Sequence, residues 1–152
     1  MGIIPQNKYC EILEAVPICC VDVLICHGGK VLLLRRKNKP AKEEWWPPGG
    51  RVHKHELLES AAVRKSYEET GLRVDIKSKI GVYETMFNDG PFSDLKGGVH
   101  TINICFLAEP ISDNPEVVLD STHSDYKWVD KIPKEFPVYI RQLLKDSGIF
   151  KR

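Results

Sequence analysis

The stretch WWPPGGRVHKHELLESAAVRKSYEETG, residues 45–71, decides the fold of this chain. Its second half carries apolar residues at helical spacing, and Gly71 is a typical residue at which a helix ends. Glu68 and Glu69 follow Lys65 by three and four positions, so all three residues lie on one side of that helix. Two adjacent carboxylates repel each other unless a cation lies between them. A hard divalent metal with oxygen ligands meets that need.

Two glycines, Gly49 and Gly50, precede the predicted helix. Because glycine has no Cβ, the backbone here is able to approach the carboxylates closely. The Gly49 carbonyl is therefore a candidate metal ligand, together with Glu68 and Glu69. An isolated pair of glutamates is usually a solvated surface feature, so the hypothesis depends on the spacing of the whole stretch.

Strand-like segments lie on both sides of the central helix, which predicts a mixed sheet flanked by helices. No repeat or long linker divides the chain, so residues 1–152 form one predicted domain in which residues 1–17 are an N-terminal arm or short helix. Residues 38–50 and 87–98 are predicted loops, the second a candidate substrate lid, and residues 138–145 a closing helix. The predicted strands are 18–26, 31–36, 72–83, 99–108 and 126–129.

The composition excludes several classes of partner. Lys and Arg number 22 and Asp and Glu 21, so no overall charge points to nucleic acid or an anionic membrane. No apolar run reaches the ~18 residues of a membrane span, and the start lacks the apolar segment of a signal peptide. We therefore expect a cytoplasmic protein. The five cysteines form no CxxC pair, and most lie in strand-like runs, which predicts reduced thiols in the core.

The central stretch resembles the Nudix box, G-x5-E-x7-R-E-U-x-E-E-x-G-U, in which U is aliphatic. The departures are Lys65, where the box has glutamate, and Ser66, where it has an aliphatic residue. The resemblance implies an α/β/α sandwich, a divalent metal and hydrolysis of a nucleoside diphosphate linked to another group. It also implies that Arg64 orients the glutamates and that Glu56 is mainly structural. The matching residues are Gly50, Glu56, Arg64, Glu68, Glu69, Gly71 and Leu72.

Lys65 disfavours a cluster of several metals, because it removes a ligand and adds a positive charge. At about 4 Å, two unit charges interact by about 4 kcal/mol at an effective dielectric constant of about 20. We expect a single Mg²⁺ or Mn²⁺ held by Glu69, Glu68 and the Gly49 carbonyl. The alternative is that Lys65 faces solvent as an ordinary salt-bridge partner.

Segments outside the box, VDVLI, LLLRRKNKPAKEEWWPPGGRVHKHE and HSDYKWV, resemble the GDP-mannose mannosyl hydrolases, a Nudix subgroup with an altered box. That resemblance implies attack of water on the anomeric carbon, release of GDP and one metal on the diphosphate. It implies that His123 is the base and that Arg36 and Arg51 bind phosphate. It further implies that Asp22 acts on the substrate or transition state and that His100 contacts the substrate.

These residue types suit such roles. Arginine binds phosphate through two parallel hydrogen bonds, histidine is the usual general base near neutrality, and a carboxylate stabilises an oxocarbenium-like transition state. The alternatives are exposed arginines, a solvated loop histidine and a hydrogen-bonded aspartate of the core.

Two differences from the subgroup leave other functions open. Glu68 is retained where the subgroup lacks a glutamate, and Thr122 replaces a glutamine that binds the metal. The expected function is Mg²⁺-dependent hydrolysis of a nucleotide sugar, GDP-mannose or GDP-glucose. The alternatives are a Nudix pyrophosphatase that attacks phosphorus in ADP-ribose, a nucleotide sugar or a nucleoside triphosphate, and a noncatalytic nucleotide-sugar sensor. The resemblance also implies a homodimer that exchanges the arm of residues 1–17.

Overall fold

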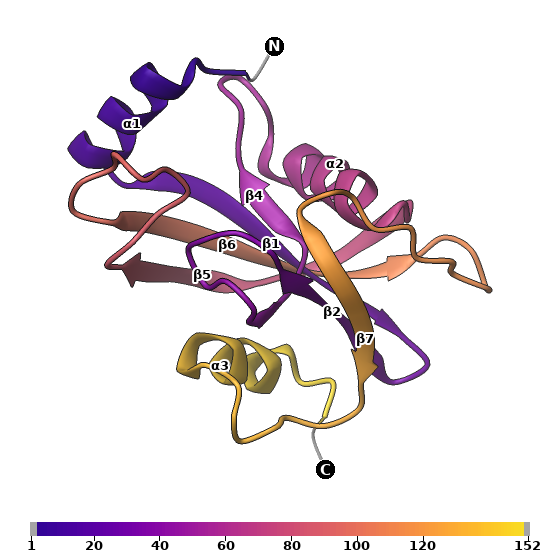
Figure 1. The fold of residues 1–152 in the computed structure, drawn as a ribbon. Helices are drawn as coiled ribbons and strands as arrows, with labels where there is room; N and C mark the ends of the chain where they lie inside the picture. The colour runs from indigo at the N-terminus through magenta and orange to yellow at the C-terminus, as the bar shows by residue number, and fades with distance from the viewer. Residues whose placement is uncertain (1–2, 151–152) are drawn as a thin grey trace.

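Residues 3–150, which this computed structural model describes, form a mixed β-sheet with a helix packed on each face (Figure 1). The helices are α1 (Gln6–Ala15), α2 (Leu58–Thr70) and α3 (Val138–Ser147). The strands are β1 (Ile18–His27), β2 (Lys30–Arg36), β3 (Trp45–Trp46), β4 (Gly49–Arg51), β5 (Val74–Phe87), β6 (Val99–Pro110) and β7 (His123–Val129).

The sheet contains both parallel and antiparallel neighbours. Its main order is β3-β2-β1-β6-β5, while β4 pairs with β1 and β7 pairs with β2. β1 runs parallel to β6 and antiparallel to β2 and β4. This arrangement confirms the predicted mixed sheet between helical layers. Because β1 lies in the middle, its side chains alternate between the layer of α2 and the layer of α3.

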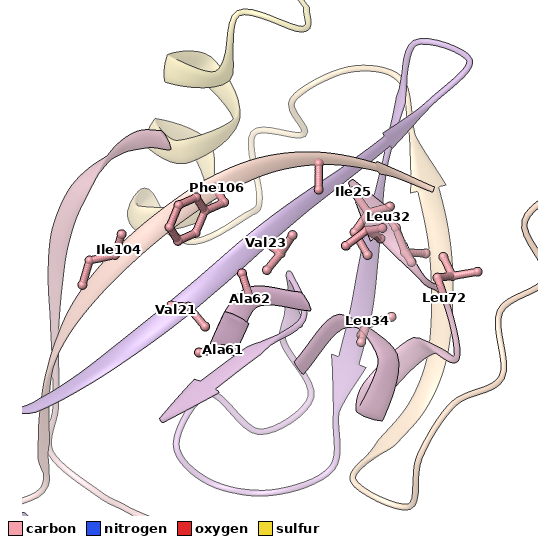
Figure 2. Packing of buried hydrophobic residues seen from close by; sticks show 12 residues of the cluster. Val21, Val23, Ile25, Leu32, Leu34, Ala61, Ala62, Leu72, Ile104 and Phe106 are labelled. Carbon is pink, nitrogen blue, oxygen red and sulfur yellow. The ribbon is translucent and has the colours of Figure 1, made fainter. Parts of the chain in front are cut away.

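Alternate residues of β1 build two separate cores. Val21 and Val23 belong to the core that includes the fully buried Ala61 and Ala62 of α2, and Figure 2 shows this packing. Leu24 belongs to the other core, with the buried apolar residues of α3. The two-residue period of a strand produces this division. The small alanines allow α2 to pack closely on the sheet, which brings its charged residues next to β4.

Two short strands replace part of the predicted loop of residues 38–50. β3 pairs with β2, and β4 pairs with β1 so that Gly49 lies opposite Asp22. A Cβ at Gly49 would collide with the carbonyl of Val21 and with Oδ1 of Asp22, so only glycine fits this approach. The prolines in the segment favoured a loop because proline cannot donate a ladder hydrogen bond. The short strands avoid that conflict by ending beside the prolines.

The central helix ends where its sequence predicts. Gly71 has a left-handed conformation with φ of 72°, and its N–H donates to the Tyr67 carbonyl at 2.9 Å. β7, in contrast, begins at His123 and not at the predicted Tyr126. β7 pairs only with β2 and carries exposed polar side chains. It therefore lacks the apolar pattern by which a strand is recognised.

The N-terminal arm packs on its own chain. α1 buries Cys10 and Leu13, and the Tyr9 ring meets the Phe92 ring at a centroid distance of 6.0 Å. The Lys96 N–H also donates to Glu14 at 2.8 Å. α1 is thus fastened to the predicted lid of residues 87–98. Residues 1–2 of the predicted arm lie outside the described residues, and the exchanged homodimer stays a prediction.

All five cysteines are free, but only three are buried. Cys10, Cys20 and Cys105 fit the predicted core thiols, whereas Cys26 is half-buried and Cys19 is exposed. The prediction is wrong for Cys19 because this residue lies near the start of β1, before the segment that α2 covers. None of the helices within residues 3–150 has the length and apolar composition needed to cross a membrane.

Candidate active site

A cleft of about 220 Å³ opens where α1, β1, β4 and the end of α2 meet. Its lining combines aromatic and aliphatic side chains with a few charged groups, as is typical of sites for small molecules. Residues of α1 and Pro91 of the predicted lid form part of its wall. Six of the predicted site residues line it: Asp22, Arg36, Gly49, Gly50, Arg51 and Glu69.

Arg64 ties the start of the central stretch to its end. Its Nε and Nη2 donate to the Glu56 carboxylate at 2.7 and 2.9 Å, its Nη1 donates to Glu68 at 3.3 Å, and its Nη2 also donates to the Arg51 carbonyl at 3.1 Å. The hydrogen bonds from Arg64 lower the pKa of Glu56 to about 2. These contacts suit the structural role predicted for Glu56. Arg64 orients Glu68 directly.

Lys65 lies between the two adjacent glutamates. Its Nζ is 3.2 Å from Glu68 Oε1 and 3.2 Å from Glu69 Oε2, and only 18% of its side chain is exposed. Burial alone would lower the pKa of Lys65, but the Glu69 and Glu68 carboxylates outweigh that effect and raise it. The end of its side chain lies against Gly50, where a Cβ would press on Lys65 Cε. Lys65 is therefore part of the site and not a solvent-facing cation.

Glu69 is the buried carboxylate of the pair. Its Oε1 accepts a hydrogen bond from the Gly49 N–H at 3.0 Å. Burial raises the pKa of Glu69, although Lys65 and His123 act in the opposite direction. A further cation nearby would stabilise the charged form of this buried carboxylate. One ligand atom each of Glu69, Asp120 and His123 lies within 4.8 Å of the other two. Because Mg²⁺ prefers oxygen ligands, the carboxylates of this group suit such a metal better than the imidazole does.

His123 is held by a carboxylate that the sequence did not single out. His123 pairs with Arg36 across the β2–β7 ladder, and only 2% of its side chain is exposed. Its Nδ1 is 2.9 Å from Asp120 Oδ1. The Thr122 hydroxyl donates to the same oxygen at 2.9 Å, so it supports Asp120. The spacing D-x-x-H, with Ser and Thr in between, is the signal that could have pointed to this turn.

Asp22 lines the cleft and is almost fully buried. Its Oδ2 accepts a hydrogen bond from the Tyr139 hydroxyl at 2.6 Å and another from Asn103 Nδ2 at 2.9 Å. Burial raises the pKa of Asp22 to about 7, although both hydrogen bonds act to lower it. Sequence reasoning missed Asn103 and Tyr139, because 81 and 117 positions separate them from Asp22.

The two predicted phosphate-binding arginines both reach the cleft. Arg36 Nε donates to the Pro40 carbonyl at 2.8 Å. Burial lowers the pKa of Arg36, while the nearby Glu69 and Asp22 raise it. The Arg51 guanidinium lies 5.4 Å from the centre of the Tyr9 ring. The arginines therefore enter the cleft from β2 and β4.

His100 lies apart from this group. Val99 and Thr101 line the cleft, and successive residues of a strand point to opposite faces. His100 instead places its Nε2 3.0 Å from Glu84 Oε2, in a partly exposed pair. The structure does not bring His100 to the other predicted residues, so its contact with substrate stays a prediction.

Comparison with known proteins gives a consistent result for most of the chain. The profile of the NUDIX domain matches residues 17–132. The low-salt glycan biosynthesis protein Agl8 of Haloferax volcanii is 37% identical over 124 residues, which cover 82% of this chain and 78% of that protein. The ADP-ribose pyrophosphatase of Methanocaldococcus jannaschii is 36% identical over 118 residues, which cover 78% of this chain and 66% of that protein.

A solved structure shares the fold. The MutT NUDIX hydrolase of Burkholderia pseudomallei superposes with a TM-score of 0.72 at 26% identity, and the match covers 86% of this chain and 98% of that one. The family match of residues 17–132 contains the sheet and α2.

Proposed function

Because this chain belongs to the Nudix family, we propose that it hydrolyses nucleoside diphosphate sugars, with GDP-mannose or GDP-glucose as the leading substrates. In the proposed reaction water attacks the anomeric carbon of the sugar, and GDP leaves. The observation that carries the proposal is the pair of the buried His123 and the half-buried Asp120 beside Glu69. A histidine held by a carboxylate next to a reduced metal site suits a reaction in which the base and the metal act on different atoms.

The proposed metal is Mg²⁺, or Mn²⁺, with Glu69, Glu68 and the Gly49 carbonyl as the residues that hold it. When bound, it would neutralise negative charge on the diphosphate leaving group. The burial of Glu69 and its raised pKa support this assignment. Lys65 already supplies one positive charge to both carboxylates, which favours one metal over several.

His123 is the proposed base. Its Nδ1 is engaged by Asp120, so its Nε2 is the atom that accepts a proton from the attacking water. Asp120 fixes the ring orientation and the tautomer, as a carboxylate partner does for other catalytic histidines. As the water oxygen bonds to the anomeric carbon, the bond from that carbon to the diphosphate oxygen breaks. The electron pair of that bond leaves with GDP.

The remaining charged groups suit the two ends of the breaking bond. Arg36 and Arg51 carry the positive charge that stabilises the departing diphosphate. Asp22 supplies negative charge to the sugar, whose ring develops positive charge as the bond breaks. All three line the same cleft, which supports their action on one substrate.

The relatives favour two related functions. The glycan biosynthesis named for the Haloferax volcanii protein supports a sugar nucleotide as substrate. The pyrophosphatase activity named for the Methanocaldococcus jannaschii protein favours a second candidate, attack on phosphorus in ADP-ribose or a similar substrate. Glu68, which the mannosyl hydrolase subgroup lacks, also favours that candidate. A noncatalytic nucleotide-sugar sensor is the third, motivated by Lys65.

Hydrolysis in ¹⁸O-labelled water separates these functions. The purified protein with Mg²⁺ is incubated with GDP-mannose, GDP-glucose and ADP-ribose, and the products are weighed by mass spectrometry. We expect the label on the sugar, with GDP as the other product. Label found only on phosphate would contradict attack at carbon and favour the pyrophosphatase. Binding without hydrolysis of any of the three would favour the sensor.

A further inference from the structure

We propose that Tyr139 of α3, together with Asn103 of β6, is a positioning residue for Asp22, so that the closing helix forms part of the active site. The proposal rests on the function proposed above for Asp22. It assigns a role to a hydroxyl group on the far side of the sheet from α2. Tyr139 acts through Asp22 and does not itself touch the substrate.

The two oxygens of Asp22 have different surroundings. Oδ2 accepts both hydrogen bonds, at 2.6 Å from Tyr139 and at 2.9 Å from Asn103. Oδ1 lies against Gly49, where a Cβ would collide with it, and both residues line the cleft. Two donors on one oxygen fix the plane of the carboxylate and leave the other oxygen directed at the bound substrate.

The hydrogen bonds behind Asn103 run in one direction. The Thr101 hydroxyl donates to Asn103 Oδ1 at 2.7 Å, which fixes the amide so that its Nδ2 faces Asp22. Since the Thr101 proton is used in this way, the Thr85 hydroxyl is the donor in the 2.6 Å contact with Thr101. Thr85 and Thr101 are both buried. The series of donors therefore ends at the Asp22 carboxylate.

The contact behind Tyr139 has the same direction. The Tyr139 proton goes to Asp22, so the Cys105 thiol is the donor in its 3.1 Å contact with the Tyr139 hydroxyl. Two separate series of donors, one from β5 and β6 and one from β6 and α3, thus converge on a single carboxylate oxygen. A buried network in which every member is satisfied holds one geometry.

Packing accounts for the Tyr139 ring but not for its hydroxyl. The ring meets Trp46 at a centroid distance of 5.6 Å and Tyr83 at 5.8 Å. Phenylalanine would keep both contacts. Tyr83 provides a matched control, because its hydroxyl donates at 2.6 Å to Asp146, an exposed contact outside the cleft.

The test compares Tyr139→Phe with Tyr83→Phe in the full-length protein. With saturating Mg²⁺ and the nucleotide sugar that the wild type hydrolyses, we expect kcat of Tyr139→Phe to fall about tenfold or more, as for loss of a hydrogen bond to a charged group. KM should change little, and Tyr83→Phe should stay close to wild type in both. Asn103→Leu should repeat the loss in kcat. Equal kcat values for Tyr139→Phe and Tyr83→Phe would overturn the proposal.

A double-mutant cycle distinguishes positioning from general destabilisation. In an Asp22→Ala background, Tyr139→Phe should cause no further loss of kcat, because the carboxylate that it positions is gone. A full additional loss would overturn the proposal. Thermal unfolding shows whether each variant folds. If Tyr139→Phe does not fold, Asn103→Leu replaces Tyr139→Phe in the cycle.

A crystal structure of Tyr139→Phe gives a result that does not depend on turnover. A turned Asp22 carboxylate is expected, and an unchanged one would overturn the positioning role. Failure of this proposal can be distinguished from failure of the proposed function. If the wild type places the ¹⁸O label on phosphate, attack at carbon fails, while the comparison of the two tyrosine variants on that substrate still decides the role of Tyr139.

Discussion

The two sides of the candidate active site are held together by different kinds of contact. We call one side the box half: Glu56, Arg64, Lys65, Glu68 and Glu69. Its charged side chains pair with one another across three to eight positions of the sequence. Two longer contacts join Arg64 to the Arg51 carbonyl, 13 positions away, and Glu69 to the Gly49 N–H, 20 positions away. Nearly all of its charge is therefore neutralised within one short stretch.

The opposite side, which we call the sheet half, consists of Asp22, Asn103, Asp120, His123 and Tyr139. Its contacts to Asp22 bridge 81 and 117 positions, whereas Asp120 lies three positions from His123. Oδ1 of Asp22 and Nε2 of His123 are the atoms that we propose act on the substrate. The box half therefore organises charge, while the sheet half presents the groups able to act on a substrate. The variants below test that division.

The largest effect is expected for His123→Gln. Removal of the base should lower kcat about 10²- to 10⁴-fold, the usual contribution of general base catalysis. Steady-state kinetics on GDP-mannose or GDP-glucose measure it, and His27→Gln, at the β1–β2 hairpin, is the control. A loss below about tenfold would show that His123 is not the base.

Asp120→Asn should have the next largest effect. The amide keeps the shape of the side chain but loses the charge that orients the imidazole, so kcat should fall about 10- to 100-fold, as for other outer partners of functional histidines. Asp125→Asn, at an exposed position of β7, is the control. If Asp120→Asn retained full activity, the Asp120 carboxylate would not be needed for the reaction, and Asp120 would not belong to the sheet half.

Lys65→Glu tests the box half. The change removes a tethered cation and adds a carboxylate, so we expect Mg²⁺ or Mn²⁺ affinity to rise about tenfold, with additional metal bound per chain. Isothermal titration calorimetry with Mn²⁺ measures both quantities. Lys54→Glu makes the same change of charge at an exposed position. Identical titrations for the two variants would mean that Lys65 does not limit metal binding.

Glu56→Gln should have the smallest effect, and on stability instead of chemistry. Glu56 has a pKa of about 2 in the folded protein against an ordinary value of 4.5, so its stabilising pairing with Arg64 is present above pH 4.5 and lost as the pH falls towards 2. The variant should lose about 1 kcal/mol at pH 7, after allowance for screening, and should show a shallower fall in stability over that acid range. Urea unfolding at several pH values measures it.

The control for this experiment is Glu59→Gln, an exposed glutamate on the same helix. It should leave both the stability at pH 7 and its acid dependence close to wild type. Equal curves for Glu56→Gln and Glu59→Gln would remove the structural role assigned to Glu56.

The same division separates what the sequence was able to predict from what it was not. The box half is local, so the spacing of Arg64, Lys65, Glu68 and Glu69 was sufficient to place them on one side of a helix that ends at Gly71. The mixed sheet also followed from apolar runs on both sides of that helix. These features depend on neighbours within a few turns of chain, which a pattern records.

The sheet half depends on contacts between distant residues. Asp22 was recognised as unusual in an apolar strand, yet its partners Asn103 and Tyr139 come from β6 and α3 and follow no common spacing. His123 was expected on a loop, because the polar residues of the edge strand β7 gave no apolar alternation. Asp120 is close to His123 in sequence, but its function becomes visible only when both lie beside Glu69.

The position of Lys65 has a consequence for how the protein tolerates loss of metal. An ammonium group attached to the same helix has a fixed local concentration that neither dilution nor a chelator changes. When metal is withdrawn, the two neighbouring glutamates still share a positive charge at 3.2 Å, so their mutual repulsion remains offset. We expect the metal-depleted protein to stay folded and to recover on addition of Mg²⁺. In effect, the chain carries a permanent counter-ion beside an exchangeable one.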